Sequence, residues 1–182
     1  MALTYSPDVE IGSPMPAFKL PVVTGGDYDS TATNGKVTVV LFICNHCPYV
    51  QAIEERLIEL GTKYHSNDDV EVLAICSNDP TEYPEDAPEA LAATATEKSY
   101  PFPYLFDQSQ SVAKAFGAVC TPDLYVYDRS GKLFYRGRLD DSWKDASKVT
   151  QKDLDSAITE ALANSTPPTE QMPSMGCSIK WI

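Results

Sequence analysis

Apolar residues along the chain recur with two periods, and these periods predict alternating strands and helices. Near-continuous apolar and β-branched runs at residues 37–43 and 70–75 are typical of strands buried on both faces. Between these runs, apolar residues recur at helical spacing at Val50, Ile53, Leu57 and Leu60. Gly61 is the expected end of that helix. A strand, a helix and a strand in this order predict a right-handed parallel βαβ unit.

The second half of the chain predicts a β-hairpin followed by a helix. Residues 124–127 and 133–137 form two strand-like runs, and the turn residues 128–131 join them. A C-terminal amphipathic helix is then marked by Leu154, Ile158 and Leu162. Between the two halves lies an insertion, for which the pattern predicts helices at 89–98 and 109–116 and a short strand at 101–106.

The two ends of the chain show weaker patterns. Residues 1–35 contain Pro14, Pro16 and a turn-rich segment, which predict an edge strand or hairpin laid against the main sheet. From Asn164 on, three prolines predict an irregular tail. We therefore expect one α/β domain over residues 1–165 and an irregular tail over residues 166–182 that packs on or near it.

Composition and charge narrow the classes of partner. The chain has 182 residues, of which 43% are apolar and 22% charged, as in a globular protein with a sizeable core. Its formal net charge of −12 disfavours nucleic acid and anionic membrane surfaces as partners. No run approaches the roughly 20 apolar residues of a membrane span, and residues 1–12 lack the pattern of a signal peptide. The five cysteines are too few for a disulfide scaffold, so we expect a cytoplasmic protein.

Candidate chemistry is concentrated in the segment Cys44-Asn45-His46-Cys47, at the junction between the first buried strand and the following helix. The first turn of a helix offers unpaired N–H groups and a positive dipole end, which stabilise a thiolate. Pro48 suits that first turn because its missing N–H is not needed there. We expect the sulfur of Cys44 to face solvent and Cys47 to be shielded. This pattern predicts thiol–disulfide exchange.

The cysteine pair and the dipeptide Thr121-Pro122, just before the hairpin, resemble the thioredoxin-like superfamily. The lead-in segment at residues 16–21 is similar to the redoxin branch, which groups alkyl hydroperoxide reductase/thiol-specific antioxidant-like proteins with cytochrome-maturation thioredoxins. Within that branch, the Cys-Asn-His-Cys motif looks like a bacterial subgroup of thioredoxin-family proteins. The resemblance implies a thioredoxin-like three-layer α/β/α fold with a central mixed sheet, an N-terminal β extension and an insertion between the βαβ and ββα halves.

The resemblance also implies roles for individual residues. Cys44 is the expected nucleophile and Cys47 the resolving cysteine, with Asn45 and His46 as supporting residues. Pro122 is the expected cis-proline, so that Thr121 presents its backbone to a substrate strand. Many thioredoxins carry a buried acid on the central strand, but residues 37–43 contain no carboxylate. The implied partners are thiols or disulfides of proteins or small molecules, with a thioredoxin reductase-type electron donor and no cofactor.

Two other functions compete with disulfide exchange. A thiol peroxidase is disfavoured because peroxiredoxins use Pro-x-x-x-Thr-x-x-Cys, and neither Cys44 nor Cys47 has that proline and threonine. A metal-binding module is the second alternative, in which Cys44, Cys47 and Cys120 would hold copper, zinc or an iron–sulfur cluster. Cys120 otherwise supports the site or packs in the core. Cys177 is either a packed tail residue or a third redox thiol, and the sequence carries no signal of an oligomeric state.

Overall fold

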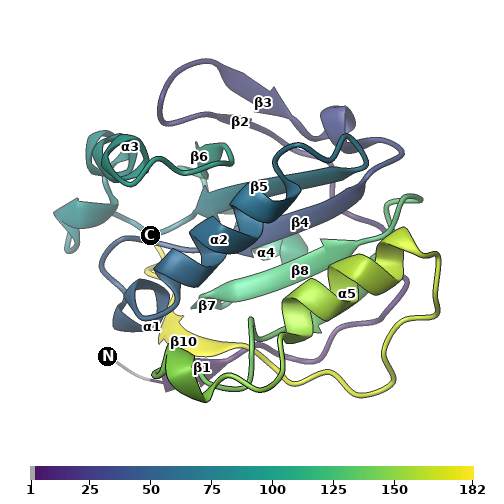
Figure 1. The fold of residues 1–182 in the computed structure, drawn as a ribbon. Coiled ribbons are helices and arrows are strands. Elements are labelled where there is room, and N and C mark those ends of the chain that lie inside the picture. The colour runs from purple at the N-terminus through teal and green to yellow at the C-terminus, as the bar shows by residue number, and fades with distance from the viewer. Residues whose placement is uncertain (1–2) are drawn as a thin grey trace.

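A mixed sheet of five strands forms the centre of the computed structural model, which describes residues 3–182 (Figure 1). The strand order is β6-β5-β4-β8-β9. The three parallel strands are β4 (Val37–Phe42), β5 (Val70–Cys76) and β6 (Tyr104–Phe106). Strand β8 (Asp123–Tyr127) pairs antiparallel with β4, and β9 (Leu133–Gly137) pairs antiparallel with β8 to form the hairpin. The predicted βαβ and hairpin halves therefore meet at β4.

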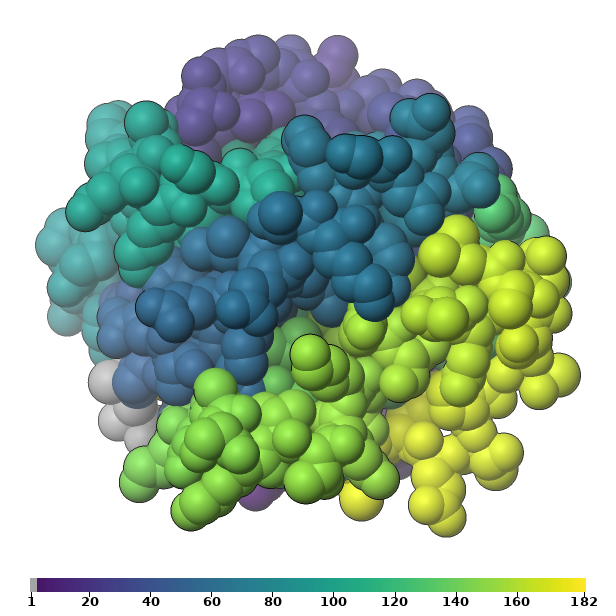
Figure 2. All heavy atoms as spheres, in the orientation of Figure 1, coloured from purple at the N-terminus to yellow at the C-terminus, as the bar shows by residue number. Residues whose placement is uncertain are grey.

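Helices cover both faces of this sheet. One face packs against α2 (Glu54–Tyr64), α3 (Pro88–Glu97) and α5 (Asp153–Leu162), and the other against α4 (Ser111–Phe116). Side chains of β4 alternate between these two cores, with Leu41 in one and Phe42 in the other, because successive strand residues point to opposite faces. Figure 2 shows α2 in blue crossing the middle of one face. The expected three-layer α/β/α fold with an insertion is confirmed.

The helix that follows the cysteine motif differs from the prediction in two respects. It is divided into α1 (Pro48–Gln51) and α2, with Ala52 and Ile53 between them. Gly61 does not end the helix but lies inside α2. A Cβ atom at this position would come within 2.5 Å of Cδ1 of Phe102, so Gly61 is needed for the close approach of the segment before β6.

The N-terminal extension forms the expected hairpin. Strands β2 (Lys19–Pro21) and β3 (Asp27–Asp29) pair with each other, and Val22 bridges to Leu105 at the β6 edge of the main sheet. The preceding strand β1 (Leu3–Tyr5) lies elsewhere, in a second small sheet. No helix in residues 3–182 has the length and apolar character needed to cross a membrane.

The sequence predicted an irregular C-terminal tail, but part of this segment forms a strand. Strand β10 (Met175–Ser178) pairs with β1 on one side and with β7 (Cys120–Thr121) on the other. In this register Cys177 lies opposite Thr121. The prolines at 167, 168 and 173 precede the strand and leave its backbone N–H groups available for pairing. The last residues of the chain therefore lie beside the loop before the hairpin (Figure 1).

Candidate active site

Both cysteines of the motif are buried at the end of β4. Cys44 follows the strand by two residues and is 1% exposed, and Cys47 is the N-cap of α1 and is 0% exposed. The expectation that the Cys44 sulfur faces solvent is therefore wrong. The hydroxyl of Thr121 lies 3.2 Å from this sulfur, and Nδ1 of His46 lies 3.7 Å from it. The side chains of Thr121 and His46 thus cover the Cys44 sulfur.

The surroundings of Cys44 disfavour its thiolate. Burial raises the pKa of Cys44 well above its ordinary value, and its hydrogen bond to Cys47 and the nearby Asp86 carboxylate raise it further. The hydrogen bond with Thr121 acts in the opposite direction but is the smaller effect. On balance these groups favour the protonated form of Cys44.

The surroundings of Cys47 favour its thiolate. The Cys44 thiol donates a hydrogen bond to Cys47 and lowers the pKa of Cys47 to about 5 in spite of burial. The thiol and backbone N–H of Cys177 and the backbone N–H of Val50 contribute to this lowering. Val50 lies in the first turn of α1, where N–H groups have no helical partner. The Cys47 thiol also donates a hydrogen bond to the Thr121 carbonyl oxygen at 3.1 Å, and this bond favours the protonated form instead.

The order of attack that the resemblance implies, with Cys44 as the nucleophile and Cys47 as the resolving cysteine, stays a prediction. The hydrogen bonds described above nevertheless favour a thiolate at Cys47 over one at Cys44. The physical reason is that Cys47, and not Cys44, occupies the N-cap of the helix. Cys44 lies instead beside the carboxylate of Asp86.

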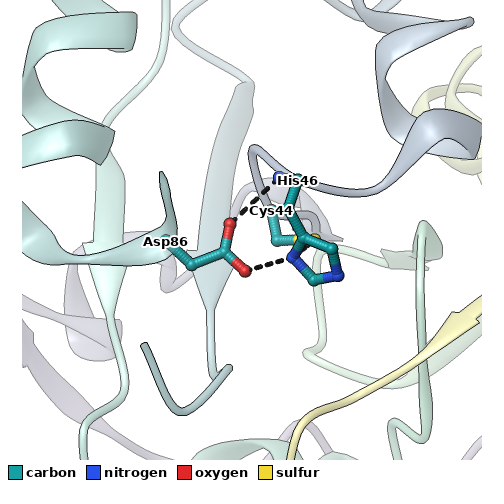
Figure 3. A group of neighbouring side chains, drawn as sticks. All are labelled: Cys44, His46 and Asp86. Carbon is teal, nitrogen blue, oxygen red and sulfur yellow. Dashed lines mark hydrogen bonds and ion pairs between the residues drawn. The ribbon is translucent and has the colours of Figure 1, made fainter. Parts of the chain in front are cut away.

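His46 forms a buried pair with Asp86, a residue of the loop before α3 (Figure 3). Nδ1 of His46 lies 2.5 Å from Oδ2 of Asp86, and the backbone N–H groups of Asn45 and His46 donate to Oδ1 at 2.8 and 3.1 Å. Asn78 donates a further hydrogen bond to Oδ2 at 2.8 Å. Burial alone would raise the pKa of Asp86, but the hydrogen bonds from His46 and Asn78 hold it below its ordinary value.

Asp86 is the residue that sequence reasoning missed. Residues 37–43 lack the buried acid found in many thioredoxins, and the structure brings a carboxylate to the motif from a segment 40 positions away from His46. Asp86 lies in a polar, Pro-rich stretch that has no periodicity. Such a stretch resembles an exposed loop, so the sequence carried no signal that this aspartate is buried.

The His46 ring is fixed on both sides. It stacks on Tyr83 with ring centroids 4.0 Å apart, and its side chain is 4% exposed. Nδ1 contacts Asp86, whereas the second ring nitrogen, Nε2, does not. Nε2 is the one buried side-chain nitrogen or oxygen in residues 3–182 that has no hydrogen-bond partner. The nitrogen that lies 3.7 Å from the Cys44 sulfur is Nδ1, the same nitrogen that contacts Asp86.

Asn45 holds the motif loop in place. Its side-chain amide donates to Oγ1 of Thr94 at 2.8 Å and to the carbonyl oxygen of Glu85 at 2.9 Å. Its own carbonyl oxygen accepts a hydrogen bond from Gln51 at 2.7 Å. The predicted supporting role of Asn45 therefore takes the form of contacts between the loop and α3.

The peptide bond between Thr121 and Pro122 is cis. The edge of Thr121, which the resemblance assigned to a substrate strand, is not open, because Cys177 of β10 pairs there. Gly176 makes this approach possible, since a Cβ atom at that position would lie 1.9 Å from the Thr121 carbonyl oxygen. The C-terminal strand of the protein itself thus occupies the edge beside the cis-proline.

The other two predicted cysteines have different surroundings. Cys177 is buried against Cys47, as described above. Cys120 is also buried, but its sulfur lies 3.7 Å from the carbonyl oxygen of Pro122, and burial raises its pKa. Cys120 is therefore a core residue next to the site rather than a direct partner of Cys44.

The structure brings together a different set of potential metal ligands from the set predicted from the sequence. Within residues 3–182, the one group of three potential ligands that lie within 4.8 Å of one another is Cys44, His46 and Asp86. The set predicted from the sequence, with Cys47 and Cys120, is not such a group. In the structure, the His46 and Asp86 atoms of the group are already bonded to each other.

Comparisons with known proteins give a family and a fold. The sequence model of the AhpC/TSA family matches residues 11–136. A crystal structure of an uncharacterized conserved protein from Geobacillus kaustophilus is 42% identical, with a TM-score of 0.93, and the match covers 100% of this chain and 97% of that one. A hypothetical protein from Sinorhizobium meliloti 1021 is 39% identical, with a TM-score of 0.92 and 98% coverage of both chains.

More distant structures share the fold alone. A thiol:disulfide interchange protein of the thioredoxin family from Chlorobium tepidum TLS is 18% identical, with a TM-score of 0.65, and the match covers 86% of this chain and 99% of that one. The search of curated proteins finds no match.

Proposed function

Because this chain belongs to the AhpC/TSA family and buries two hydrogen-bonded cysteines beside a cis-proline, we propose that it is a thiol–disulfide oxidoreductase acting through Cys44 and Cys47. The family match and the thioredoxin-like neighbours bear out the resemblance to the redoxin branch and support thiol-based redox chemistry. The single observation that carries the proposal is that the Cys44 and Cys47 sulfurs both contact Thr121 at the N-terminus of α1, where hydrogen bonds also lower the pKa of Cys47. A thiol of ordinary pKa near 8.5 is only a few per cent ionised at neutral pH.

The proposed cycle begins at Cys47. Its thiolate attacks a substrate disulfide, so that a Cys47–substrate bond forms and one substrate thiolate leaves. Cys44 then loses its proton and attacks the Cys47 sulfur, which releases the second substrate thiol and leaves the Cys44–Cys47 disulfide. The hydrogen bond between the two cysteines already sets the resolving thiol against the sulfur that it attacks.

His46 and Asp86 support the resolving step in this proposal. Cys44 must give up a proton before it attacks, and the His46–Asp86 pair lies beside it, with Nδ1 of His46 2.5 Å from Asp86 and 3.7 Å from the Cys44 sulfur. Asp86 fixes the orientation of the imidazole through Nδ1, as carboxylates do for catalytic histidines. The acid missing from β4 is thus replaced by a histidine–aspartate pair.

A comparison of two single variants tests the cycle and the order of attack. Reduced Cys44→Ser and Cys47→Ser are each mixed with oxidised glutathione, and the release of the first glutathione thiol is followed. Release by Cys44→Ser but not by Cys47→Ser is the expected result. Release by Cys47→Ser alone would restore the order implied by the motif, and release by neither would remove the proposed function. Cys120→Ser is the matched control, because this buried cysteine should behave as the wild type.

Peroxide reduction is a second candidate, because the AhpC/TSA family match and the lowered pKa of Cys47 both favour it. The groups that stabilise the Cys47 thiolate are thiols and backbone amides, and the threonine expected three residues before a peroxidatic cysteine is replaced by Cys44. Stopped-flow oxidation of the reduced protein by hydrogen peroxide separates the two functions. We expect oxidation at the rate of an ordinary thiolate, and much faster oxidation would favour the peroxidase.

The proposed partners follow from the same chemistry. They are disulfides of proteins or small molecules, and a thioredoxin reductase-type donor restores the dithiol. We also propose that the protein acts in the cytoplasm, because five cysteines are too few for a disulfide scaffold and suit a reducing compartment. Reduction of the oxidised protein by a purified thioredoxin reductase system tests the donor, and cell fractionation tests the compartment.

A further inference from the structure

Cys177 occupies the position at which a substrate cysteine would be expected. Strand β10 runs antiparallel to β7 beside the cis-proline, with Cys177 opposite Thr121. The sulfur of Cys47 lies 3.1 Å from the carbonyl oxygen of that same Thr121. Both the thiol and the backbone N–H of Cys177 donate hydrogen bonds to Cys47. The C-terminal strand thus brings a third thiol to the proposed thiolate.

The position of this strand is set by close packing and by the residues after it. Gly176 allows the backbone of β10 to contact Thr121, because any larger residue would meet the carbonyl oxygen. Beyond the strand, the backbone N–H of Lys180 donates to Asn78 at 2.9 Å, and the Lys180 carbonyl accepts from Gln110 at 2.7 Å. The side-chain amide of Asn78 also donates a hydrogen bond to Asp86. The segment is therefore anchored to the network behind His46.

The thiols of Cys44, Cys47 and Cys177 lie together in the protein interior. Cys44, Cys47 and Cys177 are each at most 1% exposed and belong to the same buried cluster. Cys47 accepts a hydrogen bond from a thiol on each side, from Cys44 of its own loop and from Cys177 of β10. Since two thiols lie against the same sulfur, either of them is placed to displace a substrate from it.

We infer that Cys177 is a second resolving thiol for Cys47, and that the Cys47–Cys177 disulfide fastens β10 over the site in the oxidised protein. This inference rests on the proposed function, because Cys47 must first form a mixed disulfide with a substrate. In that step the Cys47–substrate bond forms, the substrate disulfide breaks, and one substrate thiolate leaves and takes up a proton.

The Cys177 step is then an ordinary exchange. Cys177 loses its proton and attacks the Cys47 sulfur, so that the Cys47–Cys177 bond forms while the Cys47–substrate bond breaks. The departing substrate thiolate takes up a proton. In total, one substrate disulfide is reduced to two thiols, and two cysteine thiols of the protein are oxidised to a disulfide. A dithiol or low-molecular-weight thiol reductant must reverse that oxidation before the next cycle.

Three variants with oxidised glutathione test this inference. Reduced Cys44→Ser keeps Cys47 and Cys177, and the serine hydroxyl still donates to Cys47. We expect a short-lived glutathione adduct on Cys47, followed by a Cys47–Cys177 disulfide found by peptide mapping after acid quench. In Cys44→Ser/Cys177→Ser the adduct should persist on the order of tenfold longer, because the intramolecular thiol is gone. Cys44→Ser/Cys120→Ser is the matched control and should behave like Cys44→Ser.

The outcomes separate the inference from the proposed function. An adduct of equal lifetime in Cys44→Ser and Cys44→Ser/Cys177→Ser would overturn the inference and leave Cys47 as the attacking thiol. Absence of an adduct and of released glutathione in all three variants would overturn both. Peptide mapping of wild-type protein equilibrated in glutathione buffers needs no substitution, and it should show Cys47–Cys177 beside Cys44–Cys47. Wild-type protein without any Cys177 disulfide would count against the inference even if a variant folds poorly.

Discussion

Nδ1 of His46 lies 2.5 Å from Oδ2 of Asp86, and both side chains are buried beside the cysteine pair. The same carboxylate accepts backbone hydrogen bonds from Asn45 and His46, the two residues between the cysteines. Asp86 therefore holds the shape of the motif loop as well as the orientation of the imidazole. This relationship makes one residue outside the motif a determinant of both stability and reactivity.

Replacing this carboxylate should destabilise the protein. In Asp86→Asn the amide nitrogen cannot accept the bonds from His46 or Asn78, so a buried donor loses its partner. We expect a loss of about 1–3 kcal/mol in the free energy of unfolding near neutral pH. Urea denaturation measures this loss. Asp79→Asn replaces a half-buried acid whose carboxylate accepts hydrogen bonds from Thr81, and it should keep the wild-type midpoint. Equal midpoints for Asp79→Asn and Asp86→Asn would contradict the structural role.

The loss of stability at acid pH should also depend on the charge of Asp86. Its pKa in the folded protein is below its ordinary value, because the hydrogen bonds outweigh burial. A carboxyl with a lowered folded pKa stabilises the fold above its unfolded pKa, near 3.9, and that stability is lost as the pH falls through the folded value. Wild-type unfolding midpoints should therefore fall more steeply below about pH 4 than those of Asp86→Asn. Parallel profiles for the two proteins would show that Asp86 is not held in its charged form.

The reduced protein should contain one thiolate that titrates far below an ordinary cysteine. The hydrogen bonds to Cys47 lower its pKa to about 5, whereas Cys44 and Cys177 stay protonated, with the pKa of Cys177 raised to about 12 by burial and by its bond to Cys47. Ultraviolet absorbance of the thiolate, followed against pH, should show this transition in wild-type protein and in Cys120→Ser. Cys47→Ser should lack it. A first transition near the ordinary cysteine value would refute the assignment of the charge to Cys47.

Stability should follow that same titration. Because the Cys47 pKa is lower in the folded protein than in the unfolded chain, its contribution is complete above the unfolded value near 8.5 and is lost as the pH falls toward 5. The unfolding midpoint of the reduced wild type should therefore rise between these pH values relative to Cys47→Ser. Thermal unfolding of both proteins, with a reductant present, measures the difference.

A methyl group at Gly176 should lift β10 from the cis-proline loop. The Cβ atom would lie 1.9 Å from the Thr121 carbonyl oxygen, so the strand must move. We expect Gly176→Ala to cost about 1–3 kcal/mol of stability and to speed alkylation of Cys47 by iodoacetamide several-fold. Gly131→Ala is the control, because it strains a turn with a positive φ but meets no atom within 4 Å. It should lose stability without any gain in alkylation rate.

The residue after the cis-proline belongs to a buried ion pair that can be tested by a double replacement. Nη2 of Arg136 lies 2.6 Å from Oδ2 of Asp123, and the two side chains are 2% and 0% exposed. Arg136→Met leaves the carboxylate buried without its partner and should cost about 3–5 kcal/mol. Arg136→Met/Asp123→Leu should recover most of that loss, because no charge is then buried. Chemical denaturation compares them, and equal losses in the two variants would show that packing, not charge, is what matters.

Local patterns were sufficient for the elements and for the cysteine motif. The apolar run before Cys44, the helical spacing after Pro48 and the turn residues before Leu133 each act over a few positions, and each element lies close to where it was predicted. Gly61 shows the limit of such reasoning. A glycine inside a helical pattern resembles a stop, but α2 continues to Tyr64, and the approach of Phe102 to α2 explains why a glycine stands there.

The sequence by itself determined the fold class, the redox motif and the position of Pro122 before the hairpin, because periodicity and a four-residue spacing are local properties. Tertiary structure alone decided which groups surround each cysteine, which acid contacts His46 and what covers the cis-proline edge. Those outcomes depend on burial and on hydrogen bonds between Cys47 and Cys177, or between His46 and Asp86, residues 130 and 40 positions apart along the chain. Contacts at such separations leave no periodic trace in the sequence, because folding alone brings the partners together.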